Sequence, residues 1–268
     1  MKLPAYLLIT TFARKMVLLG IVIGSGSGGL PLYAQAWAAR FQHQQYRVHS
    51  QVPAREIAAG LKDLNSLKQA LKNDLQIKLS DQPIELYIFS SQKNYRTYVG
   101  PRVPEAVNRP AVFVKGPDAL WVYVVYRRDW EVDLRHELTH AHLHGSLPYL
   151  PIWLDEGLAK YFEVPGSKHG FNKTLHQNLA WRLRFRRGIR STDLEKLNSF
   201  VEVRPEHYRD SWAWVYYCLH STPENRKFFQ KYLLEIQAEE VPGAFFENLT
   251  RFSPDYNQQA VRFYRNHK

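Results

Sequence analysis

Hydrophobic and polar positions follow two different periods along this chain. Residues 46–50 alternate between apolar and polar like a short strand, whereas residues 53–75 place leucine and isoleucine three or four positions apart, which predicts an amphipathic helix. Three further runs are rich in β-branched and aromatic residues and are separated by connections that contain proline or glycine; they span 84–89, 111–114 and 120–126. Runs of this kind predict the strands of one sheet.

The pattern becomes helical from Trp130 onward. Pro151 is well placed to start a second helix, because proline is favoured in the first turn. Four later helices are predicted at 175–187, 209–219, 224–236 and 255–265. Strands that precede helices in this way predict an α+β fold, with a small, mostly antiparallel sheet in residues 37–128 and the chemistry in residues 129–268. We expect both parts to belong to a single domain.

The first 36 residues have the organisation of an export signal. The three basic residues of this segment are Lys2, Arg14 and Lys15. They precede the apolar run 16–24, and a Gly/Ser stretch then leads to the small-residue site 34–36. This order is typical of a secretory signal peptide, so we expect a mature chain that begins near Trp37.

An uncleaved membrane anchor is the alternative interpretation of this segment, because residues 3–13 are also apolar. Neither apolar run alone reaches the roughly 20 residues that span a bilayer, which favours cleavage. Cys218 is the only cysteine, so the chain cannot form an internal disulfide. An exported protein without disulfides indicates a bacterial periplasmic or extracellular location.

Candidate chemistry centres on residues 136–140, which read His-Glu-Leu-Thr-His and contain the H-E-x-x-H pattern. On a helix, side chains four positions apart lie on one face, so His136 and His140 can reach the same cation. Glu137 lies beside them, where it can take a proton from a water molecule that the metal activates. The pattern therefore predicts two zinc ligands and a catalytic base.

Catalytic zinc usually has three protein ligands and a fourth position for water, so one more ligand is needed. The extended pattern H-E-x-x-H-x-x-G-x-x-H requires glycine and histidine where this chain has Leu143 and Ser146, and it therefore fails. The other scheme takes a carboxylate from the next helix. Residues 151–163 contain such a group, and Glu156 is the favoured ligand.

The combination of residues 136–140 with the segment Trp-Leu-Asp-Glu-Gly-Leu-Ala at 153–159 resembles the gluzincin peptidases, particularly the peptidase MA-like domains related to the aminopeptidase N catalytic domain. In those enzymes the glutamate of a W-L-x-E-G-x-A segment is the third zinc ligand, which corresponds to Glu156. The resemblance is strong over residues 133–163 and looser in element order over residues 46–222. It implies a zincin-like fold and metallopeptidase activity.

The resemblance has a limit that concerns specificity. Aminopeptidases of that family hold the free amine of a substrate with a G-x-M-E-N segment, which is absent from this chain. The resemblance therefore does not extend to aminopeptidase specificity.

A later segment resembles the part of these enzymes that places a tyrosine near the tetrahedral intermediate. In the family this tyrosine opens a helix in a Tyr-x-x-small pattern, which Tyr208-Arg-Asp-Ser211 matches. The resemblance makes Tyr208 the candidate whose hydroxyl stabilises the oxyanion. Tyr216 and Tyr217 are alternatives, and a purely structural role for Tyr208 remains open.

Other titratable residues near the motif have ordinary structural interpretations. His142 points away from the face of the two ligand histidines, and His144, near the predicted helix end, is typical of a partner of the helix dipole. We exclude both as ligands. Glu163 and Asp133 could each support a ligand imidazole through a hydrogen bond, although a solvated carboxylate is the commoner outcome.

The formal charge of +11 falls by three to +8 once the signal is removed, and the excess favours contact with anionic envelope polymers or lipids. Part of this charge lies in residues 181–190, where arginine and aromatic residues are interleaved, a composition that also suits nucleic acid. If the segment is helical, Leu179 and Leu183 face the core and the arginines face solvent. Together with the export signal, this interpretation predicts no nucleic-acid partner.

These observations favour a metallopeptidase with one zinc ion per chain that acts on a peptide or protein. An alternative keeps the zinc but assigns the chain a non-peptidase role as an envelope binding module on a protease-like fold. Glu137 argues against it, because metal binding alone does not require that carboxylate. A third hypothesis holds that the H-E-x-x-H pattern arose by chance and that the protein is a basic surface-binding module.

Overall fold

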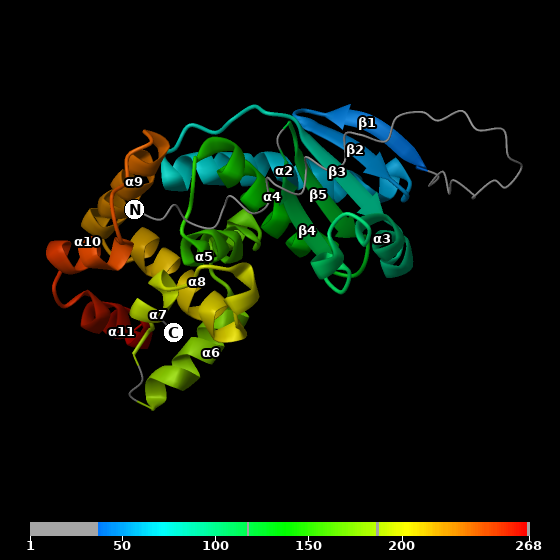
Figure 1. The fold of residues 1–268 in the computed structure, drawn as a ribbon. Coiled ribbons are helices and arrows are strands. Elements are labelled where there is room, and N and C mark those ends of the chain that lie inside the picture. Colours follow the sequence, from blue (N-terminus) through cyan, green and yellow to red (C-terminus); the bar gives the residue numbers. More distant parts are fainter. Residues whose placement is uncertain (1–36, 117, 186–187, 267–268) are drawn as a thin grey trace, which may run out of the picture. The chain divides into compact units, whose positions relative to one another are not determined.

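A computed structural model describes residues 37–116, 118–185 and 188–266 of the chain. The described part is α+β, as expected, with a small five-stranded mixed sheet and a helical majority (Figure 1). The predicted signal, residues 1–36, lies outside the described residues, as do Arg186 and Arg187 of the arginine-rich segment. None of the helices that the structure describes is both long and apolar enough to cross a membrane.

The chain divides into two compact units. The first contains the described residues up to Ala58 together with Gln82–Arg128, and the second contains Ala59–Asp81 together with the described residues from Asp129 onward. Helix α2 (Ala54–Leu75) begins in the first unit and continues in the second. The division after Arg128 coincides with the change from strand-like to helical patterning in the sequence.

The first unit is built around the sheet. Its strands are β1 (Ala39–His43), β2 (Tyr46–Ser50), β3 (Ile84–Phe89), β4 (Ala111–Lys115) and β5 (Leu120–Val125), in the order β1-β2-β3-β5-β4. Side chains alternate across the pleat, so the paired residues Val48, Leu86 and Val122 share a fully buried face. On the opposite face Tyr123 joins an aromatic cluster that includes residues of helix α3 (Gln92–Val99).

The strand directions correct the expectation of a mostly antiparallel sheet. β1 and β4 are antiparallel to their neighbours, but β2, β3 and β5 are parallel to one another. Parallel neighbours need a long crossover, and the 22 residues of α2 lie between β2 and β3 in the sequence. Apolar alternation shows which face a side chain occupies and is the same for both directions, so it could not reveal the pairing. Strand β1 was not predicted.

The second unit is helical. Its α-helices after α2 are α4 (Trp130–Ser146), α5 (Ile152–Phe162), α6 (Lys173–Arg184), α7 (Thr192–Glu195), α8 (Pro205–His220), α9 (Pro223–Gln237), α10 (Phe245–Phe252) and α11 (Tyr256–Asn266). The helices predicted from Trp130 and Pro151 correspond to α4 and α5. The four later predictions correspond to α6, α8, α9 and α11 with slightly shifted ends, whereas α7 and α10 were not predicted.

Helices α5 and α8 pack closely against each other at Gly157. A Cβ atom added there would lie 2.8 Å from the carbonyl oxygen of Ser211 and 2.9 Å from a methyl carbon of Val215. Trp153 on α5 and Trp212 on α8 are fully buried in the surrounding core. Because residue 157 has no side chain, the two helices can come this close.

We predict that Gly157→Ala destabilises the protein by about 1–2 kcal/mol. Overpacking of a close contact costs about 1–3 kcal/mol. The nearest clashing atoms, the carbonyl oxygen and carbon of Ser211, belong to the backbone of α8 and cannot rotate away. Alanine gains about 1 kcal/mol in a helix interior, so a net loss of about 1–2 kcal/mol corresponds to an overpacking cost of about 2–3 kcal/mol, the upper part of that range. Urea unfolding should show a lower midpoint with an unchanged slope.

Gly166→Ala is the matched control, because a Cβ at Gly166 would meet no atom within 4 Å. Its unfolding midpoint should stay at the parent value. Equal midpoints for Gly157→Ala and the parent would show that α5 and α8 can separate without cost.

Candidate metal centre

Helix α4 places the two histidines of the motif one turn apart on the same face. Their imidazole rings meet edge to face with centroids 4.9 Å apart, and the two Nε2 atoms are separated by 3.2 Å. The side chains are largely buried, with exposed fractions of 14% for His136 and 8% for His140. The helix therefore brings both Nε2 atoms to one position.

Helix α5 supplies a third group at this position. Glu156 Oε2 lies 3.6 Å from His136 Nε2 and 3.8 Å from His140 Nε2. This oxygen is buried and has no hydrogen-bond partner among the described residues. Burying a charged oxygen is costly unless a donor or cation meets it, so its surroundings indicate a position for a cation.

The three atoms form a triangle that matches a coordination sphere. Two ligand atoms on a tetrahedral ion with bonds of about 2.1 Å lie about 3.4 Å apart. The separations of 3.2, 3.6 and 3.8 Å surround that value. His136, His140 and Glu156 could thus hold one metal ion with only small adjustments.

A second cluster of potential ligands consists of His140, His144 and Asp155. Here His140 Nδ1 lies 2.8 Å from one oxygen of Asp155, and His144 Nε2 lies 2.7 Å from the other. These are hydrogen-bond distances, well below the roughly 3.4 Å between two ligands of one small tetrahedral ion. The second cluster is therefore better described as one carboxylate bonded to two imidazoles.

Each imidazole of the first cluster is supported at its other nitrogen by a carboxylate. Glu163 Oε2 lies 3.0 Å from His136 Nδ1, and Asp155 Oδ1 takes the corresponding place at His140. When Nδ1 donates its proton to a carboxylate, the lone pair is left on Nε2, which is the tautomer that binds a metal. Both carboxylates therefore orient the rings toward the shared position.

Charge interactions within the cluster shift the pKa values of its members. Burial alone would lower the pKa of His136, but the carboxylates of Glu156 and Glu163 outweigh it and raise this pKa to about 10. The pKa of His140 is also raised, because Asp155 and Glu156 outweigh burial. Burial would raise the pKa of Asp155, yet the adjacent imidazoles hold it well below its usual range. Without a metal ion, protonation of the imidazoles is favoured by the carboxylates that surround them.

The predicted catalytic residues lie where this part of the molecule is less deeply buried. Glu137 is half-buried, whereas residues 138–143 of the same helix are buried. Tyr208, in the first turn of α8, is also half-buried, and Lys160 Nζ lies 5.4 Å from the centroid of its ring. Lys160 Nζ also lies 2.8 Å from Glu163 Oε2. A chain of contacts thus joins Tyr208 to the carboxylate that supports the first imidazole.

Asp155 is the member of this network that sequence reasoning missed. It directly precedes Glu156, and neighbouring residues on a helix point about 100° apart. If Glu156 reaches the Nε2 atoms of the histidines, Asp155 points in another direction and can reach a different part of the same helix. This difference in direction could have identified Asp155 from the sequence. His144, which we interpreted as a partner of the helix dipole, instead bonds to Asp155.

The remaining candidates separate clearly. Glu163, one of the two carboxylates weighed for a supporting role, lies 3.0 Å from His136 Nδ1. His142 lies buried, and burial together with the charges of Lys68 and Lys72 lowers its pKa to about 3. His142 belongs to neither group of potential metal ligands among the described residues.

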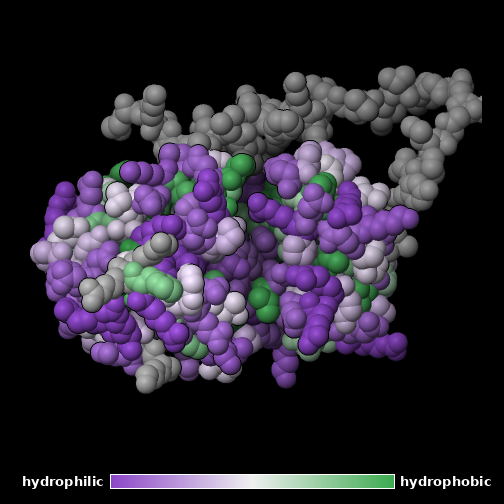
Figure 2. Space-filling view, turned by 90° about the horizontal axis from the view of Figure 1, so that it is seen from below, coloured by the Kyte–Doolittle hydropathy of each residue, from purple (hydrophilic) through white to green (hydrophobic). Residues whose placement is uncertain are grey.

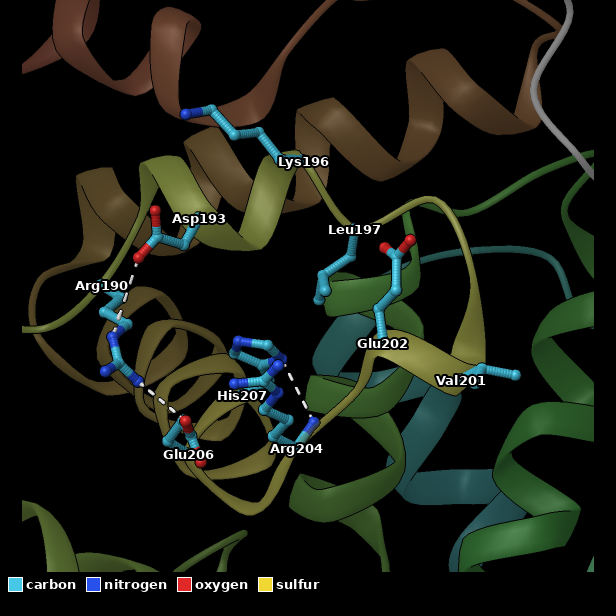
Figure 3. Close-up of a pocket in the computed structure, with 9 residues that line it drawn as sticks. All are labelled: Arg190, Asp193, Lys196, Leu197, Val201, Glu202, Arg204, Glu206 and His207. Atoms are coloured by element: carbon cyan, nitrogen blue, oxygen red, sulfur yellow. Dashed lines mark hydrogen bonds and ion pairs between the residues drawn. The ribbon is translucent and has the colours of Figure 1, made fainter.

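An open pocket of about 530 Å³ lies elsewhere in the helical unit (Figure 3). Its lining residues come from the segment around α7, a following 3₁₀ turn and the start of α8; they are Arg190, Asp193, Lys196, Leu197, Val201, Glu202, Arg204, Glu206 and His207. The lining balances three basic with three acidic side chains, and Arg190 pairs with Asp193 and Glu206. None of the predicted ligands lines this pocket, and its balanced charge selects no ion.

We predict that metal binding at the cluster releases protons. The pKa of His136 in the metal-free fold, about 10, lies above the ordinary value of 6.5, so its protonated form stabilises that fold fully below about pH 6.5. This contribution disappears as the pH rises through 10. At pH 7 an entering ion must displace the proton, and we expect about one or two protons released per ion. Calorimetric titration with zinc in buffers of different ionisation enthalpy measures this number.

Glu163→Gln provides the comparison, because it removes one of the two carboxylates that raise the pKa of His136. Fewer protons should be released by this variant than by the parent. A binding heat that is independent of the buffer would contradict the protonated state of the metal-free cluster.

Comparison with protein-family models gives no match to this chain, and no curated protein shows significant similarity to it.

Proposed function

We propose that the chain is a zinc-dependent peptidase in which His136, His140 and Glu156 bind the ion and Glu137 is the catalytic base. The observation that carries the proposal is the triangle formed by Nε2 of His136, Nε2 of His140 and Oε2 of Glu156, whose sides are 3.2, 3.6 and 3.8 Å. Its support comes from the Glu156 oxygen, which is buried and has no other partner among the described residues.

The donor set is the reason for proposing zinc. Two imidazole nitrogens and one carboxylate oxygen suit zinc, whereas calcium and magnesium prefer sites made of oxygen ligands. We expect one ion per chain. Three protein ligands leave one tetrahedral position for water or substrate, which is the arrangement of catalytic rather than structural zinc sites.

The side chains around the cluster have complementary roles in peptide hydrolysis. When bound, zinc supplies Lewis acidity, which polarises a peptide carbonyl and lowers the pKa of water toward 7. The Glu137 carboxylate accepts the proton of the attacking water and later delivers it to the departing amide nitrogen. The Tyr208 hydroxyl donates a hydrogen bond to the oxygen that gains negative charge. Asp155 and Glu163 keep the two imidazoles oriented.

We assign the enzyme to the gluzincin type and its architecture to the zincin-like class. The support is the resemblance of residues 133–163, in which the H-E-x-x-H pattern is followed by a glutamate in a W-L-x-E-G-x-A segment. The helices α4 and α5 that bring the two parts together belong to one compact unit. The substrate is a peptide or protein, and no feature of the chain favours free amino termini.

We further propose that the enzyme is exported and acts in the bacterial periplasm or outside the cell. The support is the order of basic, apolar and small residues in the segment 1–36. The chain has a single cysteine, Cys218, which is free and buried.

We predict that Glu137→Gln abolishes peptide cleavage without loss of zinc. The amide cannot accept a proton, and a lost general base slows such reactions by about 10²–10⁴-fold. Cleavage of a mixed peptide library and the zinc content after purification without chelators should be measured together. The matched control is Glu131→Gln, an exposed glutamate in the first turn of the same helix, which should keep the parent activity.

The outcomes separate the hypotheses. Cleavage by both variants at the parent rate would exclude Glu137 as the base. Zinc-loaded parent protein without any cleavage would favour the envelope binding module, and parent protein without zinc would remove both zinc hypotheses.

For Tyr208→Phe we predict a fall in kcat with little change in KM. The lost hydroxyl contributes to the transition state and not to substrate binding, and removal of one oxyanion donor costs about 10²–10³-fold in kcat. Tyr149→Phe is the control, because Tyr149 donates to the carbonyl of Glu240 and is not part of the cluster. An unchanged kcat for Tyr208→Phe would leave Tyr208 with a structural role only.

A further inference from the structure

Helix α6 presents two opposite faces. Leu179 and Leu183 are buried, with exposed fractions of 0% and 3%, which confirms the predicted core-facing side of the arginine-rich segment. Trp181 and Phe185 lie on the other side and are 64% and 62% exposed. The helix thus ends in a large aromatic surface that the core does not use.

The two exposed rings form one surface. They are one helical turn apart in sequence and meet edge to face with centroids 4.9 Å apart. The exposed Phe252, by contrast, stacks on Phe228 and is 46% exposed. Figure 2 shows that hydrophilic residues cover most of the face of the molecule that it displays, with only small hydrophobic areas between them. Exposed aromatic pairs are unusual on such a surface and mark interaction sites.

The charged residues next to this aromatic pair in the sequence are all basic. Residues 173–190 include six lysine or arginine residues and no acidic residue. A surface recess of about 580 Å³ is lined by Trp181, Arg182, Phe185 and Arg209, the last from α8. An anion would meet two guanidinium groups and two aromatic rings there.

Arg209 is prepared to bind such an anion. Its Nε donates to Asp210 Oδ1 at 2.7 Å, which fixes the side chain. Its Nη2 is buried and has no hydrogen-bond partner among the described residues. If the side chain turned this nitrogen toward the recess that it lines, a phosphate or carboxylate oxygen would accept a charge-assisted hydrogen bond from it.

These features together fit the surface of an anionic membrane. Tryptophan and phenylalanine favour the layer between the lipid headgroups and the acyl chains, and clustered basic residues are attracted to anionic headgroups. We propose that the C-terminal end of α6 docks on an anionic phospholipid bilayer. Trp181 and Phe185 enter the interfacial layer, and a lipid phosphate lies between Arg182 and Arg209.

The geometry favours a bilayer over a soluble anionic polymer. A single-stranded polymer binds along a basic groove with flat aromatic platforms, whereas here the rings meet at an interplanar angle of 63° at the end of one helix. A soluble polyanion without bases, such as a sulfated polysaccharide, would also gain nothing from the apolar edges of two rings that are more than half exposed. A bilayer offers an apolar layer for the two aromatic rings and, next to it, phosphate groups for the two arginines.

The test compares full-length variants on vesicles of phosphatidylcholine with and without phosphatidylglycerol. Every variant carries the same residues 1–36, so any membrane contact of that segment is common to all. Arg182→Gln with Phe185→Ala should lower partition onto phosphatidylglycerol vesicles by about tenfold, since each basic residue contributes about fivefold and the aromatic ring adds to it. Partition of the parent should weaken with added salt.

The matched control is Arg251→Gln with Phe252→Ala, which removes an exposed arginine and a partly exposed phenylalanine from α10. This variant should partition like the parent. A local readout uses brominated phosphatidylglycerol, which should quench part of the tryptophan fluorescence of the parent but less of that of Trp181→Phe. Circular dichroism and urea midpoints should match for all variants, so that loss of folding is separated from loss of docking.

Equal partition of the two double variants would overturn the proposal, as would quenching that is the same in the parent and in Trp181→Phe. Loss of binding to dextran sulfate or to single-stranded DNA, with unchanged vesicle partition, would reassign the surface to a soluble polyanion. The test does not involve peptide cleavage or zinc, so its result is independent of the proposed peptidase function.

Discussion

The helical unit must accommodate two adjacent buried carboxylates. They lie on helix α5, which is buried along most of its length. Asp155 and Glu156 are 0% and 4% exposed. Charges in such surroundings must meet donors or cations, because desolvation would otherwise outweigh the packing that buries them. Helix α4 meets the constraint with imidazoles, so the position of α4 against α5 follows from charge pairing as well as from apolar contact.

The local parts of this arrangement could be predicted from the sequence, because they depend on periodicity over a few residues. The spacing of His136 and His140 places them on one helix face whatever surrounds them, and Glu156 follows from a short segment with a distinctive composition. The parallel strands were missed because alternation carries no direction, although the helix predicted between residues 46–50 and 84–89 is the kind of crossover that parallel neighbours need. The position of Asp155 next to Glu156 was a usable signal, but its partners, His140 and His144, depend on how two helices meet.

For helix α6, the sequence predicted the buried face but not the use of the exposed face. The spacing of Leu179 and Leu183 predicted which face of α6 is buried, and the structure agrees. The same spacing says nothing about whether another element covers Trp181 and Phe185. The recess beside them also needs Arg209 from α8, a helix that is distant in sequence. Composition suggested contact with anionic material, but its location on the molecule required the fold.

The bond from Asp155 to two imidazoles has a consequence for the order of assembly. The carboxylate already joins α5 to His140 and His144 of α4 through hydrogen bonds of 2.8 and 2.7 Å. These bonds need no ion, so the contact between α4 and α5 does not depend on metal, and an ion could enter between helices that are already joined. Chelation would then empty the site and leave the scaffold standing, in contrast to small zinc domains that unfold when the metal is removed.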